Sequence, residues 1–481
     1  MPQVVVIADD LTGANATGCQ LRKNKLRVVT LMKGAKSFAS LAASIQQYDC
    51  ITYSSNSRGV DSQEAYQRVY HGVRMLKDKN TAVYAKRIDS TLRGNIGKET
   101  EAFLDALDNE AIALVVPCFP DAGRTCENGR LLVDGVPLHQ TVAAADPKNP
   151  IDTDEVGAIL AKQTDYSFAL VTRADLLKGK ETLAQIIRQR RDEGIRMLIF
   201  DAANQKDLDL IAKGAILAKE YVVAVDPGVF TATLSAHRLS KTRIEQASTI
   251  GLAEEGLPKE RRLLAKTDKV LIVIGTVNKV ATEQYLRFLE TRECHHVLID
   301  IKELVESEET RIAEMERVVA EILGNNNGNN KGNSKVNKGK VSNEKASKGG
   351  KDEGKTNQVS AIVLSSIYPE NRIDFEPYLK SGQTIEDISS MINQTVASIV
   401  HNILKADPAI GSLYTSGGDI SAAVCARLDA TGIILDREIV PLASYGELFG
   451  GDFEGLRCIT KGGMVGDKDA LVTCVDFLEN I

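Results

Sequence analysis

Short apolar runs alternate with longer amphipathic stretches along this chain, and this alternation constrains the fold more than any other feature. The runs are rich in Val and Ile and are bounded by turn residues, as expected of strands buried on both faces. In the first half they occupy Val4–Ala8, Arg27–Leu31, Ile51–Ser54, Ala82–Tyr84, Ile112–Val116, Phe168–Val171, Met197–Phe200 and Tyr221–Val225. Helical periodicity fills the intervals, as in Asn15–Lys23, Gln63–Leu76 and Lys98–Leu107. The pattern predicts an α/β fold, with a mainly parallel sheet flanked by helices.

The alternation weakens after Asp226 and resumes at Val270, which divides the chain into two parts. A chain of 481 residues is also longer than one ordinary hydrophobic core supports. The later strands are expected at Val270–Ile274, Val297–Ile299, Ala361–Ser365 and Leu413–Thr415. We therefore predict two α/β domains, at residues 1–234 and 267–481, each with its own mainly parallel sheet. The polar, basic residues 235–266 are expected to connect them.

Residues 324–358 differ from the rest of the chain in composition. They contain eight Lys against one Asp and two Glu, a local charge of +5, and almost no apolar side chains. Such a segment cannot recover the entropy cost of ordering. We predict a disordered, low-complexity insertion in a surface loop of the second domain, after a charged helix at Lys302–Leu323. The alternative is a basic arm that binds an anionic partner.

The bulk composition excludes several classes of protein. A net charge of −6 argues against broad nucleic-acid binding, and no apolar run approaches the ~20 residues of a membrane span. The chain begins without the basic and long apolar regions of a signal peptide, so the cytoplasm is the expected compartment. The eight cysteines form no CxxC pair and the six histidines no HxxH pair. We expect buried reduced thiols and no His-based zinc site. A homodimer is a possible assembly.

Two carboxylates, Asp9 and Asp10, directly follow the first predicted strand. Ligands of open parallel sheets bind at the carboxyl ends of the strands. Thr12-Gly13 permits a tight turn into the next helix, whose N-terminal N–H groups can bind an anion. One aspartate could orient or deprotonate an attacking hydroxyl, while the other holds substrate hydroxyls or a hydrated Mg²⁺. The alternative is that one of them only caps the helix.

A cluster of cations lies at the end of another predicted strand. Lys86, Arg87 and Arg93 surround Asp89 in sequence. Arginine matches a carboxylate with a planar fork and lysine with a point charge, so the set suits a hydroxylated acid. Strand alternation should direct Lys86 and Arg87 to opposite faces. Arg58, in a loop after a third strand, is a second candidate carboxylate clamp. The alternative is a salt-bridged strand end.

Three glycine-bearing turns lie at or beside predicted strand ends in the second domain, at residues 275–278, 415–419 and 460–467. Glycine permits positive φ and close backbone approach, which form anion-binding nests. Neither the P-loop pattern nor GxGxxG is present. Phosphate-binding turns in one domain and paired carboxylates in the other indicate phosphoryl transfer to a small substrate.

Seven motifs together resemble the four-carbon acid sugar kinase family, in family order and over nearly the whole chain outside the insertion. They are ADDLTGANATG (8–18), NSR (56–58), KRIDSTLRGN (86–95), PCFPDAGRT (117–125), VDGVPL (133–138), SGGD (416–419) and KGGMVG (461–466). The resemblance implies a sugar-acid-binding N-terminal domain, a nucleotide-binding C-terminal domain and an active site in the cleft between them.

The resemblance also implies the reaction and its site residues. The reaction is ATP-dependent phosphorylation of the terminal hydroxyl of a four-carbon sugar acid, with Mg²⁺ bridging ATP oxygens and no protein metal ligand assigned. The expected catalytic residues are Asp9 and Asp10, and Asp10, Arg58, Lys86, Arg87, Asp89 and Arg93 are the expected substrate ligands. The expected ATP-binding residues are Thr276, Gly417, Gly418, Asp419, Gly462, Gly463, Met464, Val465 and Gly466.

Three positions depart from the family pattern. Ala16 stands where the family usually has Asp, Ile420-Ser421 where it has Thr-Ala, and Thr276 where it has Ser. The KGGMVG loop is more similar to those of D-threonate and D-erythronate kinases than to those of 3-oxo-tetronate kinases. A 3-oxo-tetronate kinase is the alternative enzyme. Because of Ala16 and the altered SGGD continuation, a non-catalytic sugar-acid sensor is the alternative of another class.

Overall fold

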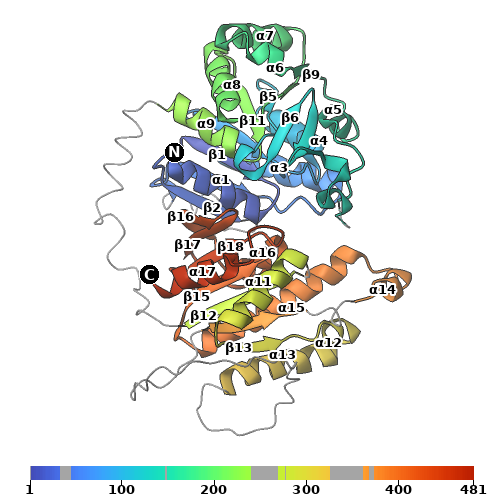
Figure 1. Ribbon diagram of the computed structural model, residues 1–481, viewed down its shortest axis with the longest axis vertical. Helices are drawn as coiled ribbons and strands as arrows, with labels where there is room; N and C mark the ends of the chain where they lie inside the picture. Colours follow the sequence, from blue (N-terminus) through green and yellow to red (C-terminus); the bar gives the residue numbers. More distant parts are fainter. Residues whose placement is uncertain are drawn as a thin grey trace, which may run out of the picture.

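The computed structural model describes residues 2–32, 45–146, 149–239, 269–276, 278–324, 361–367 and 373–481. Its strands and helices form two α/β halves stacked end to end, with the N-terminal half above and the C-terminal half below in Figure 1. Helix α9 includes residues 235–238 of the predicted connection, and residues 240–266 of it lie outside the described residues. Most of the predicted insertion, 325–358, also lies outside them.

The N-terminal half contains a parallel sheet of eight strands in the order β2-β3-β1-β4-β11-β5-β10-β9. These strands are β1 (Val4–Ala8), β2 (Val28–Met32), β3 (Cys50–Ser54), β4 (Val83–Arg87), β5 (Ile112–Val115), β9 (Phe168–Val171), β10 (Met197–Phe200) and β11 (Val222–Asp226). The helices are α1 (Leu11–Lys23), α3 (Ser62–Leu76), α4 (Ile96–Ala106), α5 (Val156–Ala161), α6 (Arg173–Leu176), α7 (Lys180–Asp192), α8 (Gln205–Ala218) and α9 (Val229–Arg238). A separate antiparallel sheet comprises β6 (Arg124–Glu127), β7 (Arg130–Val133) and β8 (Val136–Pro137).

Successive residues of each strand lie on opposite faces of this sheet, because successive side chains of a strand point in opposite directions. In β1, Val4 and Val6 belong to the buried cluster that includes residues of α1, α8 and α9, whereas Val5 and Ile7 belong to the one that includes residues of α3 and α4. The prediction of a parallel sheet with helices on both faces is therefore confirmed. Strand β9 is an edge strand, and 36% of Phe168 and 39% of Leu170 are exposed, so the predicted burial of this strand on both faces was wrong.

The C-terminal half contains five parallel strands followed by an antiparallel pair, in the order β13-β14-β12-β15-β18-β17-β16. These strands are β12 (Lys269–Ile274), β13 (His295–Leu298), β14 (Ala361–Ser365), β15 (Ile410–Ser416), β16 (Gly432–Val440), β17 (Ala443–Phe449) and β18 (Arg457–Lys461). The helices are α11 (Lys279–Thr291), α12 (Ile301–Glu306), α13 (Glu308–Gly324), α14 (Glu376–Lys380), α15 (Ile385–Ala406), α16 (Gly418–Arg427) and α17 (Ala470–Glu479). The helix predicted at Lys302–Leu323 is interrupted at Ser307, whose extended backbone separates α12 from α13.

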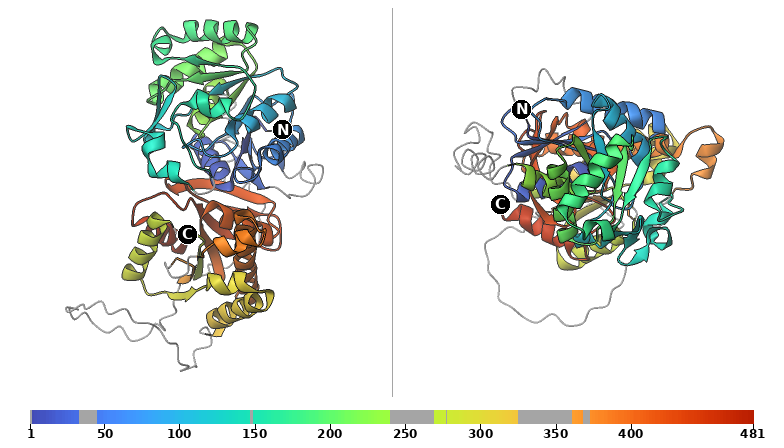
Figure 2. Two further views of the ribbon diagram at one scale, coloured as in Figure 1. Left: turned by 90° about the vertical axis from the view of Figure 1, so that its right-hand side faces the viewer. Right: turned by 90° about the horizontal axis from the view of Figure 1, so that it is seen from above.

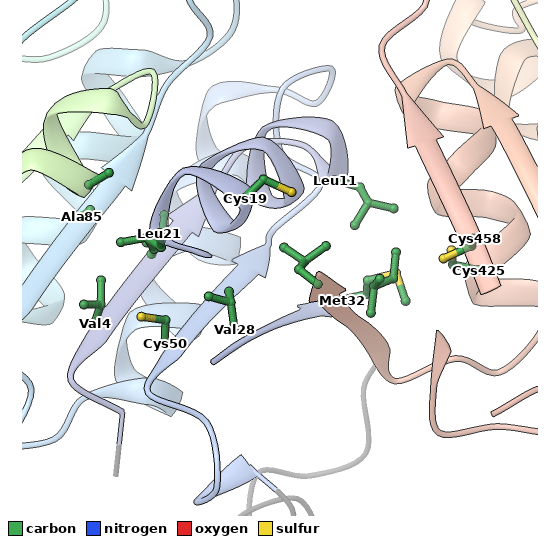
Figure 3. Packing of buried hydrophobic residues seen from close by; sticks show 14 of the residues in the cluster. Val4, Leu11, Cys19, Leu21, Val28, Met32, Cys50, Ala85, Cys425 and Cys458 are labelled. Carbon is green, nitrogen blue, oxygen red and sulfur yellow. The ribbon is translucent and has the colours of Figure 1, made fainter. Parts of the chain in front are cut away.

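Strand β16 joins the two halves. It pairs antiparallel with β2, so that the two sheets form one continuous sheet of 15 strands, and it crosses between the halves in both side views (Figures 1 and 2). One buried cluster also extends across the junction. Leu11 and Met32 belong to it from the N-terminal half and Cys425 and Cys458 from the C-terminal half (Figure 3). The two halves are therefore held in a defined relation by a strand pair and a shared core.

Candidate active site

The ends of three neighbouring strands assemble the first part of the site. Strands β3, β1 and β4 are adjacent and parallel, so their carboxyl ends meet at one edge of the sheet. Asp9 follows β1, Arg58 lies in the loop after β3, and Arg87 ends β4. The backbone N–H groups of Ser57 and Arg58 donate to the Asp9 carbonyl oxygen over 2.8 and 3.3 Å. The structure thus brings Arg58 and Arg87 to Asp9 from 49 and 78 positions away in sequence, as expected for this topology.

Arg58 is the centre of the acidic cluster. Its Nε and Nη2 donate to the two carboxylate oxygens of Asp9 over 2.7 and 3.0 Å. Its Nη1 donates to Asp10 Oδ2 over 2.7 Å, and Nη2 lies 3.6 Å from Asp89 Oδ1. Burial alone would lower the pKa of Arg58, but the charges of Asp10, Asp9 and Asp89 hold it well above its usual value. One guanidinium therefore bridges three carboxylates at the sheet edge.

The two aspartates of the first turn differ in exposure and in contacts. Burial would raise the pKa of Asp9, but the charges of Arg58, Lys86 and Arg87 outweigh it and hold the pKa below its ordinary value. Asp9 has 3% of its side chain exposed, whereas Asp10 has 15%. Asp10 caps α1, because its Oδ1 accepts from the Gly13 N–H over 2.6 Å. Arg87 Nη1 lies 3.3 Å from an oxygen of each aspartate.

Arg93 extends the cluster toward the C-terminal half. It pairs with Asp89 through Nε and Nη2, over 2.8 and 3.0 Å, and its Nη1 donates to Asp146 Oδ2 over 2.8 Å. The same Nη1 lies 3.8 Å from the Met464 sulfur, which belongs to the last glycine turn. Burial would lower the pKa of Arg93, but the charge of Asp89 outweighs it and raises that pKa. Burial would likewise raise the pKa of Asp89, but the charges of Arg58 and Arg93 hold it well below its ordinary value.

Lys86 lies on the opposite face of β4 from Arg87, as strand alternation predicted. Its Nζ is 2.7 Å from Glu99 Oε2 of α4 and donates to the Arg87 carbonyl oxygen over 2.7 Å. Ser57 donates to the other carboxylate oxygen of Glu99 over 2.5 Å. Burial, the largest influence, raises the pKa of Glu99 although Lys86 opposes it. Through the Ser57–Glu99 hydrogen bond, the buried pair thus supports the loop that contains Arg58.

Gly13 leaves room for the Arg87 guanidinium, and Gly13→Ala is expected to test this contact. A Cβ on Gly13 would lie 2.1 Å from Arg87 Nη1. Alanine favours helices over glycine by about 1 kcal/mol, so a net loss of about 1–3 kcal/mol in the free energy of unfolding would report the clash. Urea denaturation of Gly13→Ala beside Gly324→Ala, where a Cβ meets nothing within 4 Å, checks it. An unchanged or raised stability of Gly13→Ala would contradict the contact.

The three glycine-bearing turns also lie together, because β12, β15 and β18 are adjacent parallel strands. The Gly275 N–H donates to the Ser416 carbonyl oxygen over 3.1 Å, and the Gly417 N–H to that of Lys461 over 2.9 Å. Gly417 has φ of 118°, which favours glycine, and α16 begins immediately after it. A Cβ on Gly463 would lie within 3.1 Å of three Thr276 atoms. The turns form one surface of backbone and small side chains at the start of a helix.

The acidic turn and the glycine turns face each other across the junction of the two halves. A Cβ on Gly418 would lie 3.3 Å from Thr12 Oγ1 and 3.5 Å from Asp10 Oδ2. A Cβ on Gly462 would lie 3.5 Å from the Thr12 methyl group. Within the described part of the chain, Thr12 Oγ1 and Arg87 Nε have no hydrogen-bond partner. The N-termini of α1 and α16 therefore meet at a point lined by a carboxylate, a free hydroxyl and two glycines.

Three residues of this arrangement were not among the predicted site residues. Asn15 donates to Thr460 Oγ1 over 2.8 Å across the junction, Glu99 neutralises Lys86, and Asp146 holds Arg93. Asn15 lies within the ADDLTGANATG motif, which was a usable signal. Glu99 and Asp146 carry no sequence signal, since isolated acidic residues are usually solvated.

Family models and relatives agree with this geometry. A sugar-binding N-terminal domain matches residues 4–234, and a nucleotide-binding C-terminal domain matches residues 342–471. The fold and these family models thus define an α/β protein that matches a sugar-binding and a nucleotide-binding domain. The chain belongs to the four-carbon acid sugar kinase family, whose members are phosphotransferases with an alcohol group as acceptor. The resemblance inferred from the motifs is confirmed.

Relatives and solved structures cover nearly the whole chain. A D-erythronate kinase of Heliobacterium modesticaldum is 36% identical over 99% of this chain and 97% of its own length. A D-threonate kinase of Salmonella typhimurium is 27% identical over 100% and 99%. The fold matches a solved Salmonella typhimurium protein with a TM-score of 0.70 at 18% identity, covering 98% of this chain and 99% of that one. A solved Haemophilus influenzae protein gives 0.62 at 20% identity, over 98% and 100%.

None of the helices described here has the length and apolar character needed to cross a bilayer. Across the described residues, no three His, Cys, Asp or Glu side chains are grouped so as to hold a metal ion. Seven of the eight cysteines are buried and Cys294 is half-buried.

Proposed function

We propose that this protein is an ATP-dependent kinase that phosphorylates the 4-hydroxyl of a four-carbon sugar acid, D-erythronate or D-threonate. The observation that carries the proposal is the proximity of Asp10 to the start of α16. A Cβ on Gly418 would lie only 3.5 Å from the Asp10 carboxylate. An acceptor hydroxyl held by Asp10 would thus be adjacent to a helix N-terminus, which is suited to a phosphate. The names of the relatives support both acids.

Asp10 is the proposed acceptor of the proton from the 4-hydroxyl. It is the more exposed of the two aspartates, and its Oδ2 faces the glycine turn. Asp9 is the proposed positioning residue, because it binds Arg58 through both oxygens and is almost fully buried. Its lowered pKa keeps it ionised, which favours holding two arginines over accepting a proton.

The arginines around Asp89 are the proposed ligands of the substrate. Arg58 and Arg93 have side chains that are each 17% exposed, and a guanidinium can exchange part of its carboxylate contacts for a substrate carboxylate. Arg87 Nε is a donor without a partner among the described residues. Asp89 is the proposed acceptor for substrate hydroxyls. Lys86 has its Nζ bound to Glu99, so its predicted contact with the acid would require this pair to separate.

The glycine turns are the proposed binding site of ATP. Thr276, Gly417 and Gly418 would contact the phosphates from the ends of β12 and β15, and Gly462 to Gly466 from the end of β18. Asp419 lies in the first turn of α16 and is exposed. Mg²⁺ commonly binds one or two carboxylates together with substrate phosphates, so this donor set fits the ion. Mg²⁺ would neutralise charge on the phosphates, and Asp419 is its proposed protein ligand.

A substrate panel tests the proposed function. The purified protein with ATP and Mg²⁺ is offered D-erythronate, D-threonate and the 3-oxo acids, and ADP release is measured. Turnover with D-erythronate or D-threonate exceeding that with the 3-oxo acids by about tenfold or more is expected, since a site that binds a hydroxyl rejects analogues that lack it. A preference for the 3-oxo acids would assign the alternative kinase. Calorimetric binding of an acid without ADP release would instead indicate a sensor.

A further inference from the structure

Two lysines are fully buried among the described residues, and they differ in how their charge is balanced. Lys86 has the carboxylate of Glu99 at 2.7 Å. Lys461, at the end of β18, has no salt-bridge partner within the described part of the chain. A buried cation without a counter-charge is costly unless something compensates it. The compensation for Lys461 must therefore come from dipoles of the protein or from a bound anion.

Lys461 shapes the last glycine turn through two backbone carbonyls and contacts a second turn through its own. Its Nζ donates to the carbonyl oxygens of Gly462 and Val465 over 2.7 and 2.8 Å, which curls the turn around the ammonium group. Its own carbonyl oxygen accepts from the Gly417 N–H over 2.9 Å. An ammonium group has three donors, and only two have acceptors among the described residues. Lys461 thus links two of the glycine turns and retains one N–H.

The surroundings of Lys461 are uncharged. Ser416 of β15 and Ala443 of β17 flank it in the sheet, and Tyr414 lies two residues before Ser416 on β15. Cys474 of α17 is an ionisable group that acts on it. Burial raises the pKa of Cys474 to about 12 and that of Tyr414 well above its ordinary value, so both are neutral. Gln284 of α11 shares the Val465 carbonyl oxygen with Lys461, over 3.0 Å. Burial lowers the pKa of Lys461 itself to about 8.

We propose that Lys461 is a positioning residue of the nucleotide site, which holds the 462–466 turn open for phosphate and supplies the fixed positive charge beneath it. The proposal rests on the proposed function. It explains why a lysine without a carboxylate is buried next to three glycine turns, since the ionised phosphates of a nucleotide would provide the missing counter-charge. The nucleotide would contact the backbone of the turn, and Lys461 would act through that backbone and through its field.

Binding of ADP and of adenosine to purified variants tests the proposal. Lys461→Met removes the charge and the two hydrogen bonds, whereas Lys461→Gln removes the charge but keeps two N–H donors. Lys468→Met, at an exposed lysine a few residues along the chain, is the matched control. Calorimetry is expected to show ADP affinity lowered at least about tenfold in both Lys461 variants, the size of one charge-assisted interaction. Adenosine affinity, and ADP affinity of the control, should stay unchanged.

The pH dependence of ADP affinity distinguishes the effect of the Lys461 charge from its effect on the structure of the turn. Because Lys461 is charged below about pH 8 and neutral above it, ADP affinity of the wild type should fall between about pH 7.5 and about pH 9.5. This range lies above the second pKa of a terminal phosphate, about 6, so the charge of ADP itself changes little. Lys461→Gln should lack this fall. Equal losses for ADP and adenosine, or unchanged ADP binding in Lys461→Gln, would overturn the proposal. A wild type that binds no ADP would overturn the proposed function as well, so the two failures are distinguishable.

Discussion

Replacing Asp10 by Asn is expected to lower kcat by about 10²–10⁴-fold and to leave nucleotide affinity unchanged, because the proton acceptor is lost while the shape of the turn is kept. Asparagine still accepts the hydrogen bond from the Gly13 N–H that starts α1, since Asn and Asp cap helices about equally well. Steady-state kinetics with the preferred acid, together with calorimetry of ADP binding, measure both quantities. The loss should appear in kcat more than in the KM for ATP.

Asp61 provides a matched control for this substitution. It caps α3 as Asp10 caps α1, accepting from the Gln63 and Glu64 N–H groups, but it lies at an exposed position outside the cluster. Asp61→Asn should therefore retain normal turnover. Asp9→Asn should weaken the hold on Arg58 and raise the KM for the acid. Near-normal turnover in both Asp10→Asn and Asp9→Asn would remove the assignment of this turn as catalytic.

The second large effect is expected on stability, from the buried pair of Lys86 and Glu99. Lys86→Met is expected to lower the free energy of unfolding by about 3–5 kcal/mol, because Glu99 would be left as an unpaired charge in the core. The side chains are 0% and 1% exposed. The double variant Lys86→Met/Glu99→Leu should recover most of that loss, since both charges are then absent. Urea denaturation followed by circular dichroism gives the three values.

Lys98 and Glu101 form a control pair on α4, the helix that carries Glu99. Their side chains are 26% and 15% exposed, so Lys98→Met should cost about 1 kcal/mol or less. The double variant at 86 and 99 also tests the prediction that Lys86 binds the substrate. If stability recovers and the KM for the acid stays within about twofold of the wild type, the role of Lys86 is to support the loop of Arg58. A double variant less stable than Lys86→Met would contradict the account of the pair.

The alternation of apolar runs was sufficient to predict most of the fold. Strands β1, β9, β10 and β14 have the predicted bounds, and the other predicted strands shift by a few residues at most. The sequence did not predict the β16–β17 hairpin or its pairing with β2. The apolar run of β16 is interrupted by the charged residues Asp436, Arg437 and Glu438, so it lacks the continuous apolar signal of a strand buried on both faces.

The candidate site, too, was predicted only in part from the sequence. Motifs predicted Asp9, Asp10, Arg58 and Asp89 as site residues, and the structure places them together because parallel strands deliver the residues after them to one edge of the sheet. The salt-bridge partners of these residues could not be predicted from the local sequence. That Arg58 bridges three carboxylates, and that Glu99 neutralises Lys86, depends on contacts between elements far apart in sequence.

The sequence by itself determined the fold class and the family and supplied the candidate site residues, since periodicity and motif spacing are properties of short segments. Only the tertiary structure decided how those residues are buried and paired. It showed Asp9 buried among arginines and Asp10 facing Gly418, and it left Lys461 enclosed without a carboxylate among the described residues. Burial and counter-charge are set by packing between the two halves, and neither can be read from one segment alone.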